Sequence, residues 1–154
     1  MFKARKGLMK ALLAFSTGLM LLSCTTVKMY SGPDLPADQV AIIESSDLSV
    51  NIESCDGIPT RYSRLAVLPG EHAVEMSIRE SPQGSWTYWS INNSTFSFIA
   101  QAGHTYAVGW KVLPEAYDLY VVVVRDKTAG GIVPLTSESK PQPLGMYFDS
   151  DFFR

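Results

Sequence analysis

Hydrophobic and polar residues alternate with a period of two through most of the chain after residue 38. Residues 48–52, 72–78, 95–100 and 105–110 each place apolar side chains at every second position. Such alternation is typical of β-strands with one buried face. We expect segment 72–78 to carry Val74, Met76 and Ile78 on its buried face. On the same grounds, segment 95–100 carries Phe96 and Phe98 on one face, and segment 105–110 carries Tyr106, Val108 and Trp110.

Turn residues divide these segments every eight to twelve positions, as in an all-β sandwich or barrel. Asp56-Gly57, Pro69-Gly70, Ala102-Gly103 and residues 126–131 are the predicted turns. Four consecutive valines at 121–124 predict a strand that is buried on both sides or lies at the centre of the sandwich. The pattern thus predicts an antiparallel sandwich of about seven to nine strands over residues 38–135. Residues 136–154 carry Pro141 and Pro143 and predict an irregular C-terminal tail.

The first 23 residues follow a different pattern. Lys3, Arg5 and Lys6 precede an apolar run from residue 11 to residue 22, and a small residue, Ser23, follows. The run has about 12 residues, whereas a helix that spans a bilayer needs about 20. The order of basic, apolar and small regions predicts a secretory signal peptide over residues 1–23, whose apolar run is helical.

Leu21-Leu22-Ser23-Cys24 resembles the lipobox of bacterial lipoproteins. The resemblance implies that the Cys24 thiol receives a diacylglycerol, that a peptidase cuts before Cys24, and that the new amino group is acylated. The alternative is an ordinary secretory signal with a chance cysteine. Thr25 stands where an aspartate would imply retention in the inner membrane, so the resemblance implies the outer membrane, facing the periplasm. Residues 24–37 then predict a lipidated cysteine and a tether that lifts the domain off the lipid.

Removal of the signal peptide changes the charge of the protein. Four of the 13 basic residues lie before Cys24, so nine basic residues remain against 15 acidic ones, a formal charge of −6. An acidic body without clustered lysine and arginine argues against nucleic acid as a partner. Because 46% of the residues are hydrophobic, the chain can build a core and is not a disordered protein.

Cys55, His72 and His104 are the candidates for metal or thiol chemistry. Once Cys24 is acylated, Cys55 has no cysteine partner and is either a buried, inert residue at a strand end or a reactive thiol. Together with Asp56, Glu71 or Glu75, the two histidines could form a metal site or an acid/base pair. However, the sequence contains no HxxxH, HExxH or CxxC spacing, and histidines next to turns also bind backbone carbonyls.

No pattern in the chain predicts an enzyme or a cofactor. Ser85 follows Gly84 but lacks the Gly-x-Ser-x-Gly elbow of a serine hydrolase. Aromatic residues are concentrated from residue 86 to residue 110, and alternating aromatics often belong to a core. If they point outward, Trp86, Tyr88 and Trp89 form a candidate surface for a carbohydrate or a protein.

Several short motifs occur in a characteristic order: Asp56-Gly57, Leu68-Pro69-Gly70-Glu71-His72, and Ala102-Gly103-His104-Thr105-Tyr106. Over about residues 30–135 the chain resembles a set of largely uncharacterised proteobacterial lipoproteins, and the first two motifs resemble the PEGA domain. The resemblance implies an immunoglobulin-like β-sandwich at a bacterial surface and supplies no catalytic residues.

Together these observations predict a non-catalytic binding or structural module, held at the outer membrane through lipid on Cys24 and contacting envelope proteins or glycan. The alternative is a metal- or thiol-dependent periplasmic activity that uses His72, His104 or Cys55.

Overall fold

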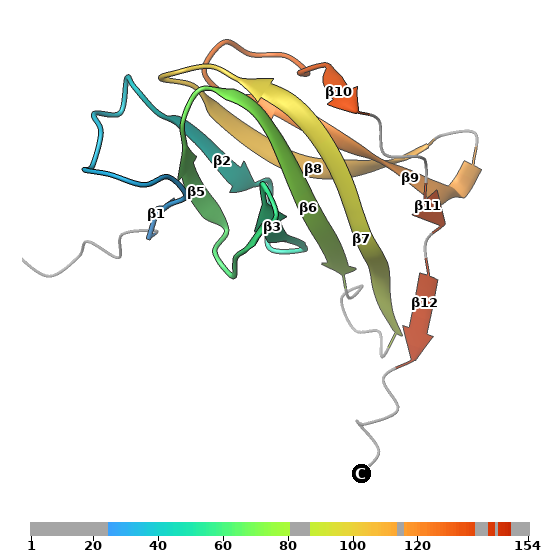
Figure 1. The fold of residues 1–154 in the computed structure, drawn as a ribbon. Coiled ribbons are helices and arrows are strands. Elements are labelled where there is room, and N and C mark those ends of the chain that lie inside the picture. Colours follow the sequence, from blue (N-terminus) through green and yellow to red (C-terminus); the bar gives the residue numbers. More distant parts are fainter. Residues whose placement is uncertain (1–24, 81–86, 114–115, 138–141, 144, 149–154) are drawn as a thin grey trace, which may run out of the picture.

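The computed structural model describes residues 25–80, 87–113, 116–137, 142–143 and 145–148. Within these residues the chain forms two β-sheets (Figure 1). Sheet A contains, in spatial order, β1 (Val27–Lys28), β5 (Arg64–Val67), β2 (Ala41–Ser45), β8 (Thr105–Leu113), β9 (Ala116–Asp126) and β11 (Gln142–Pro143). Sheet B contains β10 (Leu135–Ser137), β7 (Thr87–Ala100), β6 (Gly70–Glu80), β3 (Val50–Cys55) and β4 (Ile58–Pro59), with β12 (Gly145–Phe148) also paired to β7.

The alternating strands turn their apolar side chains toward one another and form a single core between the sheets. Phe98 of sheet B is completely buried, and its ring lies 5.2 Å from the ring of Tyr106 in sheet A. Contacts of this kind join large aromatic surfaces across the two layers and remove them from water. The prediction of an all-β sandwich is therefore confirmed, as are the inward faces of β6, β7 and the first half of β8.

The chain crosses repeatedly between the sheets, which makes the pairing less uniform than expected. It passes from β2 in sheet A to β3 and β4 in sheet B, returns to β5, and then forms the β6–β7 and β8–β9 hairpins. These crossings place β2 beside β8 and β1 beside β5 in parallel. The predicted antiparallel sandwich is confirmed as a mainly antiparallel one, with these two parallel pairings. The described residues form twelve strands where about seven to nine were expected, because alternation within a strand does not reveal its neighbour or the shortest strands.

The segment after Cys24 is attached to the domain and is not the tether that its composition predicted. Val27 and Lys28 pair with β5, the amide of Met29 donates to the carbonyl of Ala66 at 2.9 Å, and Val27 and Met29 pack against the core. The loop that follows is also anchored, since the Lys28 ammonium lies 2.9 Å from the Asp34 carboxylate. The polar, proline-containing segment after Cys24 therefore forms an edge strand, β1, and a loop that the Lys28–Asp34 ion pair holds in place.

The described part of the C-terminal segment is also more regular than predicted. β10 and β12 pair with β7, and β11 pairs with β9. These strands have two to four residues, which is too short for alternation to show in the sequence. The boundary predicted at residue 135 therefore does not mark the end of the sheets.

Candidate functional site

The outer face of sheet A carries a shallow hollow of about 310 Å³. Ala107 and Gly109 occupy neighbouring outward positions on β8, and Val123 lies opposite Gly109 on β9. Their small side chains leave a depression, while Arg125 and the residues around it rise at its margin. Its lining is made by Glu44, Ser46, Ala107, Gly109, Trp110, Val123, Arg125 and Lys127.

Basic side chains dominate this face. Glu44, whose side chain is 13% exposed, accepts hydrogen bonds from Arg64 Nη1 and from Lys127 Nζ, the latter at 2.6 Å. Arg125 on β9 and Lys111 on β8 are exposed on the same face. On β2, β5, β8 and β9 and directly after β9, the described outward charges are thus four basic to one acidic, while the exposed Asp47, two residues beyond β2, accepts a bond from Ser46. We call Arg64, Lys111, Arg125 and Lys127 the basic face. Exposed guanidinium and ammonium groups of this kind bind phosphates and carboxylates.

The outer face of sheet B carries the opposite charge. Glu53, Glu71 and Glu75 point outward from β3 and β6, and we call them the acidic face. Polar neighbours bind their carboxylates: Asn93 Nδ2 donates to Glu75 at 2.7 Å, and Ser54 Oγ donates to it at 3.0 Å. Arg79 is the one basic residue among the described outward side chains of β3, β6 and β7.

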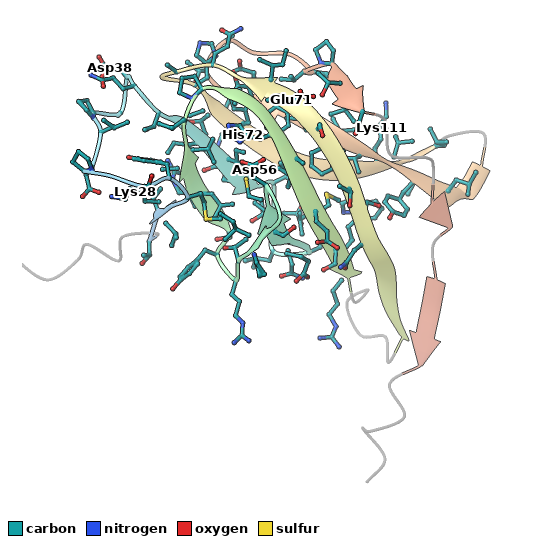
Figure 2. The ribbon with its side chains drawn as sticks, viewed as in Figure 1. Lys28, Asp38, Asp56, Glu71, His72 and Lys111 are labelled. Atoms are coloured by element: carbon teal, nitrogen blue, oxygen red, sulfur yellow. The ribbon has the colours of Figure 1, made fainter. Side chains whose placement is uncertain are left out.

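A cluster of metal-ligand type lies at the β3–β4 turn. Asp56 and Gly57 have φ angles of 52° and 76°, as a two-residue type I′ hairpin requires. This turn brings the carboxylate of Asp56 toward β6, where its Oδ2 lies 2.7 Å from His72 Nδ1 (Figure 2). Cys55 Sγ lies 3.9 Å from the same oxygen. One ligand atom from each of the three residues lies within 4.8 Å of the others.

The surroundings of this cluster favour a structural role. Cys55 is 1% exposed, and burial together with the neighbouring Asp56 carboxylate raises the pKa of its thiol to about 12. The thiolate that attacks electrophiles or binds metals is therefore strongly disfavoured. His72 also approaches the carbonyl oxygen of Leu68 through Nε2 at 2.6 Å. The ring thereby connects the turn after β3 with the turn before β6.

His104 forms a second histidine–aspartate pair, in sheet A. Its Nδ1 lies 2.7 Å from Asp126 Oδ2 at the end of β9. Burial raises the pKa of Asp126, but hydrogen bonds from His104 and from the amides of Ala129 and Thr128 outweigh burial and lower it. Asp126 Oδ1 accepts from these amides at 2.9 and 2.8 Å, so the pair closes the turn after β9.

The structure thus places the predicted site residues in separate groups. Cys55 and His72 come together with Asp56, whereas His104 binds a different carboxylate on the other sheet. Cys24 and Trp86 lie outside the described residues. Tyr88 and Trp89 belong to the described backbone of β7, opposite Tyr147 and Met146 of β12, but their side chains lie outside the described part.

The basic face was missed in the sequence. Its four residues lie on β5, on β8, on β9 and just after β9, separated by up to 63 positions, as the numbers of Arg64 and Lys127 show. No local pattern reveals such a grouping, because the pairing of the strands creates it.

Comparison with known proteins adds no relative: no family model, curated protein or solved structure matches the chain. In the residues that the structure describes, no helix is long and apolar enough to cross a membrane.

Proposed function

We propose that this protein is a lipid-anchored lipoprotein of the bacterial envelope, held by Cys24 at the outer membrane and facing the periplasm, and that it acts as a non-catalytic binding or structural module. The observation that carries the proposal is Leu21-Leu22-Ser23-Cys24 at the end of a basic and then apolar segment. An acylated cysteine with several chains holds a protein firmly at a bilayer.

The structure adds a reason to expect a module that works close to the lipid. β1 begins at Val27, so only Thr25 and Thr26 separate the predicted lipid from the first paired residue. The three steps from Cys24 to Val27 span at most about 11 Å. The paired sheets therefore sit at the membrane surface, where the module meets envelope proteins or glycan through its outward faces and through the proposed surface of Trp86, Tyr88 and Trp89.

The direct test is to replace Cys24 by alanine and to supply a fatty-acid analogue that carries a chemical handle. We expect the wild-type chain to incorporate the analogue and to be shortened, and Cys24→Ala to do neither. Cys55→Ala is the matched control, because it removes the other cysteine of the chain and should leave acylation intact. Normal processing of Cys24→Ala would overturn the proposal.

A second candidate function is binding of a transition metal by Cys55, Asp56 and His72. The observation that favours it is their grouping, since one ligand atom from each of the three residues lies within 4.8 Å of the others and the residue types are those that bind zinc. The test is titration of the purified protein with Zn²⁺ and with Co²⁺, whose thiolate absorption reports Cys55. No thiolate band and no change in the thermal midpoint would exclude the metal role; a band that Cys55→Ala abolishes would support it.

A further inference from the structure

We propose that the basic face of sheet A rests on the anionic phospholipid headgroups of the membrane that holds Cys24, so that sheet B faces the periplasm. This inference rests on the proposed lipidation and adds an orientation to it. It concerns Arg64, Lys111, Arg125 and Lys127 and the hollow between them.

The point where the chain leaves the domain supports this orientation. Thr26 Oγ1 accepts a hydrogen bond from Arg64 Nε at 3.1 Å, so the anchor departs beside a residue of the basic face. The two steps from Thr26 to Cys24 span at most about 7 Å, whereas packed sheets lie about 10 Å apart. The predicted lipid therefore cannot reach around the sandwich to the outer face of sheet B.

Charge selects the same side. The predicted mature chain has a formal charge of −6, and an anionic bilayer repels it as a whole. Screening limits this field to about 8–10 Å, so the side chains that face the lipid decide the interaction. The basic face offers four cations around Glu44, whereas the outer face of sheet B offers three carboxylates and Arg79. Basic residues near an anionic surface attract it additively.

The shape of the face fits a layer of headgroups. Its cations are spread over the sheet, from Arg64 on β5 to Arg125 on β9, with β2 and β8 between these two strands. The hollow, floored by Ala107, Gly109 and Val123, has room for a headgroup phosphate beside Arg125 and Lys127. The Lys28 ammonium pairs with Asp34 and is not needed for the contact.

The test uses the acylated full chain, reconstituted into vesicles of phosphatidylcholine with or without phosphatidylglycerol. A fluorophore is attached either to Val121→Cys, which points outward from β9, or to Ser97→Cys, which points outward from β7. Cys55 does not compete for the label, since it is buried, and an acylated Cys24 has no free thiol; a chain that is not acylated is labelled in a Cys24→Ala background. A lipid with a spin label on its headgroup quenches a fluorophore that touches the headgroup layer.

With phosphatidylglycerol present, we expect strong quenching at position 121 and little at position 97. We expect this difference to disappear in vesicles of phosphatidylcholine alone. It should also disappear in 1 M salt, where the screening length falls to about 3 Å. The double variant Arg125→Gln, Lys127→Gln should lower the equilibrium constant that favours the orientation with sheet A on the lipid by about thirtyfold. This is the expected loss when two basic residues no longer attract the anionic surface. The matched control, Glu71→Gln with Glu75→Gln, should retain a preference for position 121, because the four cations of the basic face remain in place.

Equal quenching at the two positions, stronger quenching at position 97, or a preference for position 121 that ignores salt would each overturn the proposal. Incorporation of the fatty-acid analogue is measured on the same preparation and reports the anchor separately. A chain without the analogue would refute the proposed function, and salt-sensitive quenching at position 121 in that chain would still support the basic face as a headgroup surface.

Discussion

The two outer faces of the sandwich are built from the same kind of alternating strand but carry opposite charge. On sheet A, Arg64 and Lys127 surround the single carboxylate of Glu44, and Arg125 and Lys111 add further positive charge. On sheet B, Glu53, Glu71 and Glu75 accept hydrogen bonds from hydroxyl and amide donors. The described bonds of the glutamates thus differ between the sheets: Glu44 binds two basic groups, whereas Glu53, Glu71 and Glu75 bind polar side chains.

This difference shows that net charge is a poor guide to what each surface contacts. A chain with an acidic body still presents a basic side, since the sandwich separates its charges by about the thickness of two sheets. At physiological ionic strength that separation is comparable to the screening length, so the two faces act almost independently. Each face can therefore meet a different neighbour.

The largest effect is expected from a substitution in the core that holds the two sheets, and so their two outer faces, together. Phe98 is completely buried and contacts Tyr106 of the other sheet, so Phe98→Ala should lower the free energy of unfolding by about 3–5 kcal/mol. The neighbouring residue on β7, Ile99, is 57% exposed, and Ile99→Ala should change it by less than about 0.5 kcal/mol. Urea denaturation measures both. Similar losses would mean that the sheets are not joined at Phe98.

The next effect concerns the turn that carries Lys127 on the basic face. Asp126→Asn should lower the free energy of unfolding by about 2 kcal/mol, because the carboxylate accepts hydrogen bonds from His104 and from two backbone amides. Asp56→Asn, at the matching pair in sheet B, should cost about 1 kcal/mol, since its side chain is 45% exposed and asparagine tolerates its positive φ. The difference in thermal midpoint between the two variants checks this order, and a larger loss for Asp56→Asn would contradict it.

The pH dependence of stability provides a second test of the contribution of the Asp126 carboxylate. The pKa of Asp126 in the folded protein lies below its ordinary value of 3.8, so folding favours the carboxylate. Its contribution is present above pH 3.8 and is lost as the pH falls through the folded pKa. Asp126→Asn should therefore flatten the acid decline of the unfolding free energy. Part of the decline should remain, because hydrogen bonds from Ser49 and Ser46 outweigh burial and lower the pKa of Asp47 as well.

A smaller change alters the hollow of the basic face alone. A Cβ atom at Gly109 would lie 2.7 Å from Ser46 Oγ and 3.1 Å from Ser46 Cβ, so Gly109→Ala must displace Ser46. We expect a loss of about 1 kcal/mol from this overpacking. Ala107→Gly, at the next outward position on β8, is the control that enlarges the hollow without a clash. Thermal denaturation distinguishes them, and an unchanged midpoint for Gly109→Ala would mean that Ser46 moves freely.

The smallest effect on stability comes from the carboxylate at the centre of the basic face. Glu44→Gln removes the partner of Arg64 and Lys127 and should cost at most about 1 kcal/mol, because both cations are partly exposed. Its larger consequence is electrostatic: the orientation preference on anionic vesicles should increase. Glu75→Gln on the acidic face should not increase that preference, and an equal increase in both variants would show that only net charge matters.

Much of the fold could be read from local patterns. Val74, Met76 and Ile78 alternate with polar residues, so their common inward face could be predicted before the partner strands were known. Asp56-Gly57 predicted a tight turn, since few other pairs adopt two positive φ angles easily. The four valines were only partly predicted: Val122 and Val124 face the core, whereas Val121 and Val123 lie half-exposed on the outer face of sheet A.

Other features depend on contacts between distant residues and could not be predicted. Residues 25–37 looked like a tether, because nothing in Val27-Lys28 reveals that β5 offers a free edge. The sequence named the bond from a histidine to a backbone carbonyl and named Asp56 among the carboxylates that could pair with a histidine, and His72 makes both contacts. It did not name Asp126, the partner of His104. Asp56 and His72 are 16 positions apart, and only the β3–β6 pairing brings them together.

The sequence by itself determined the alternation, the turns and the predicted signal and lipidation site at Cys24, because each depends on residues that are neighbours along the chain. The tertiary structure alone decided which strands lie side by side, and through them the burial of Cys55, the two histidine–aspartate pairs and the basic and acidic faces. Charges on separate strands add to one field only when the folded sheets hold them on the same side, and no local pattern encodes that arrangement.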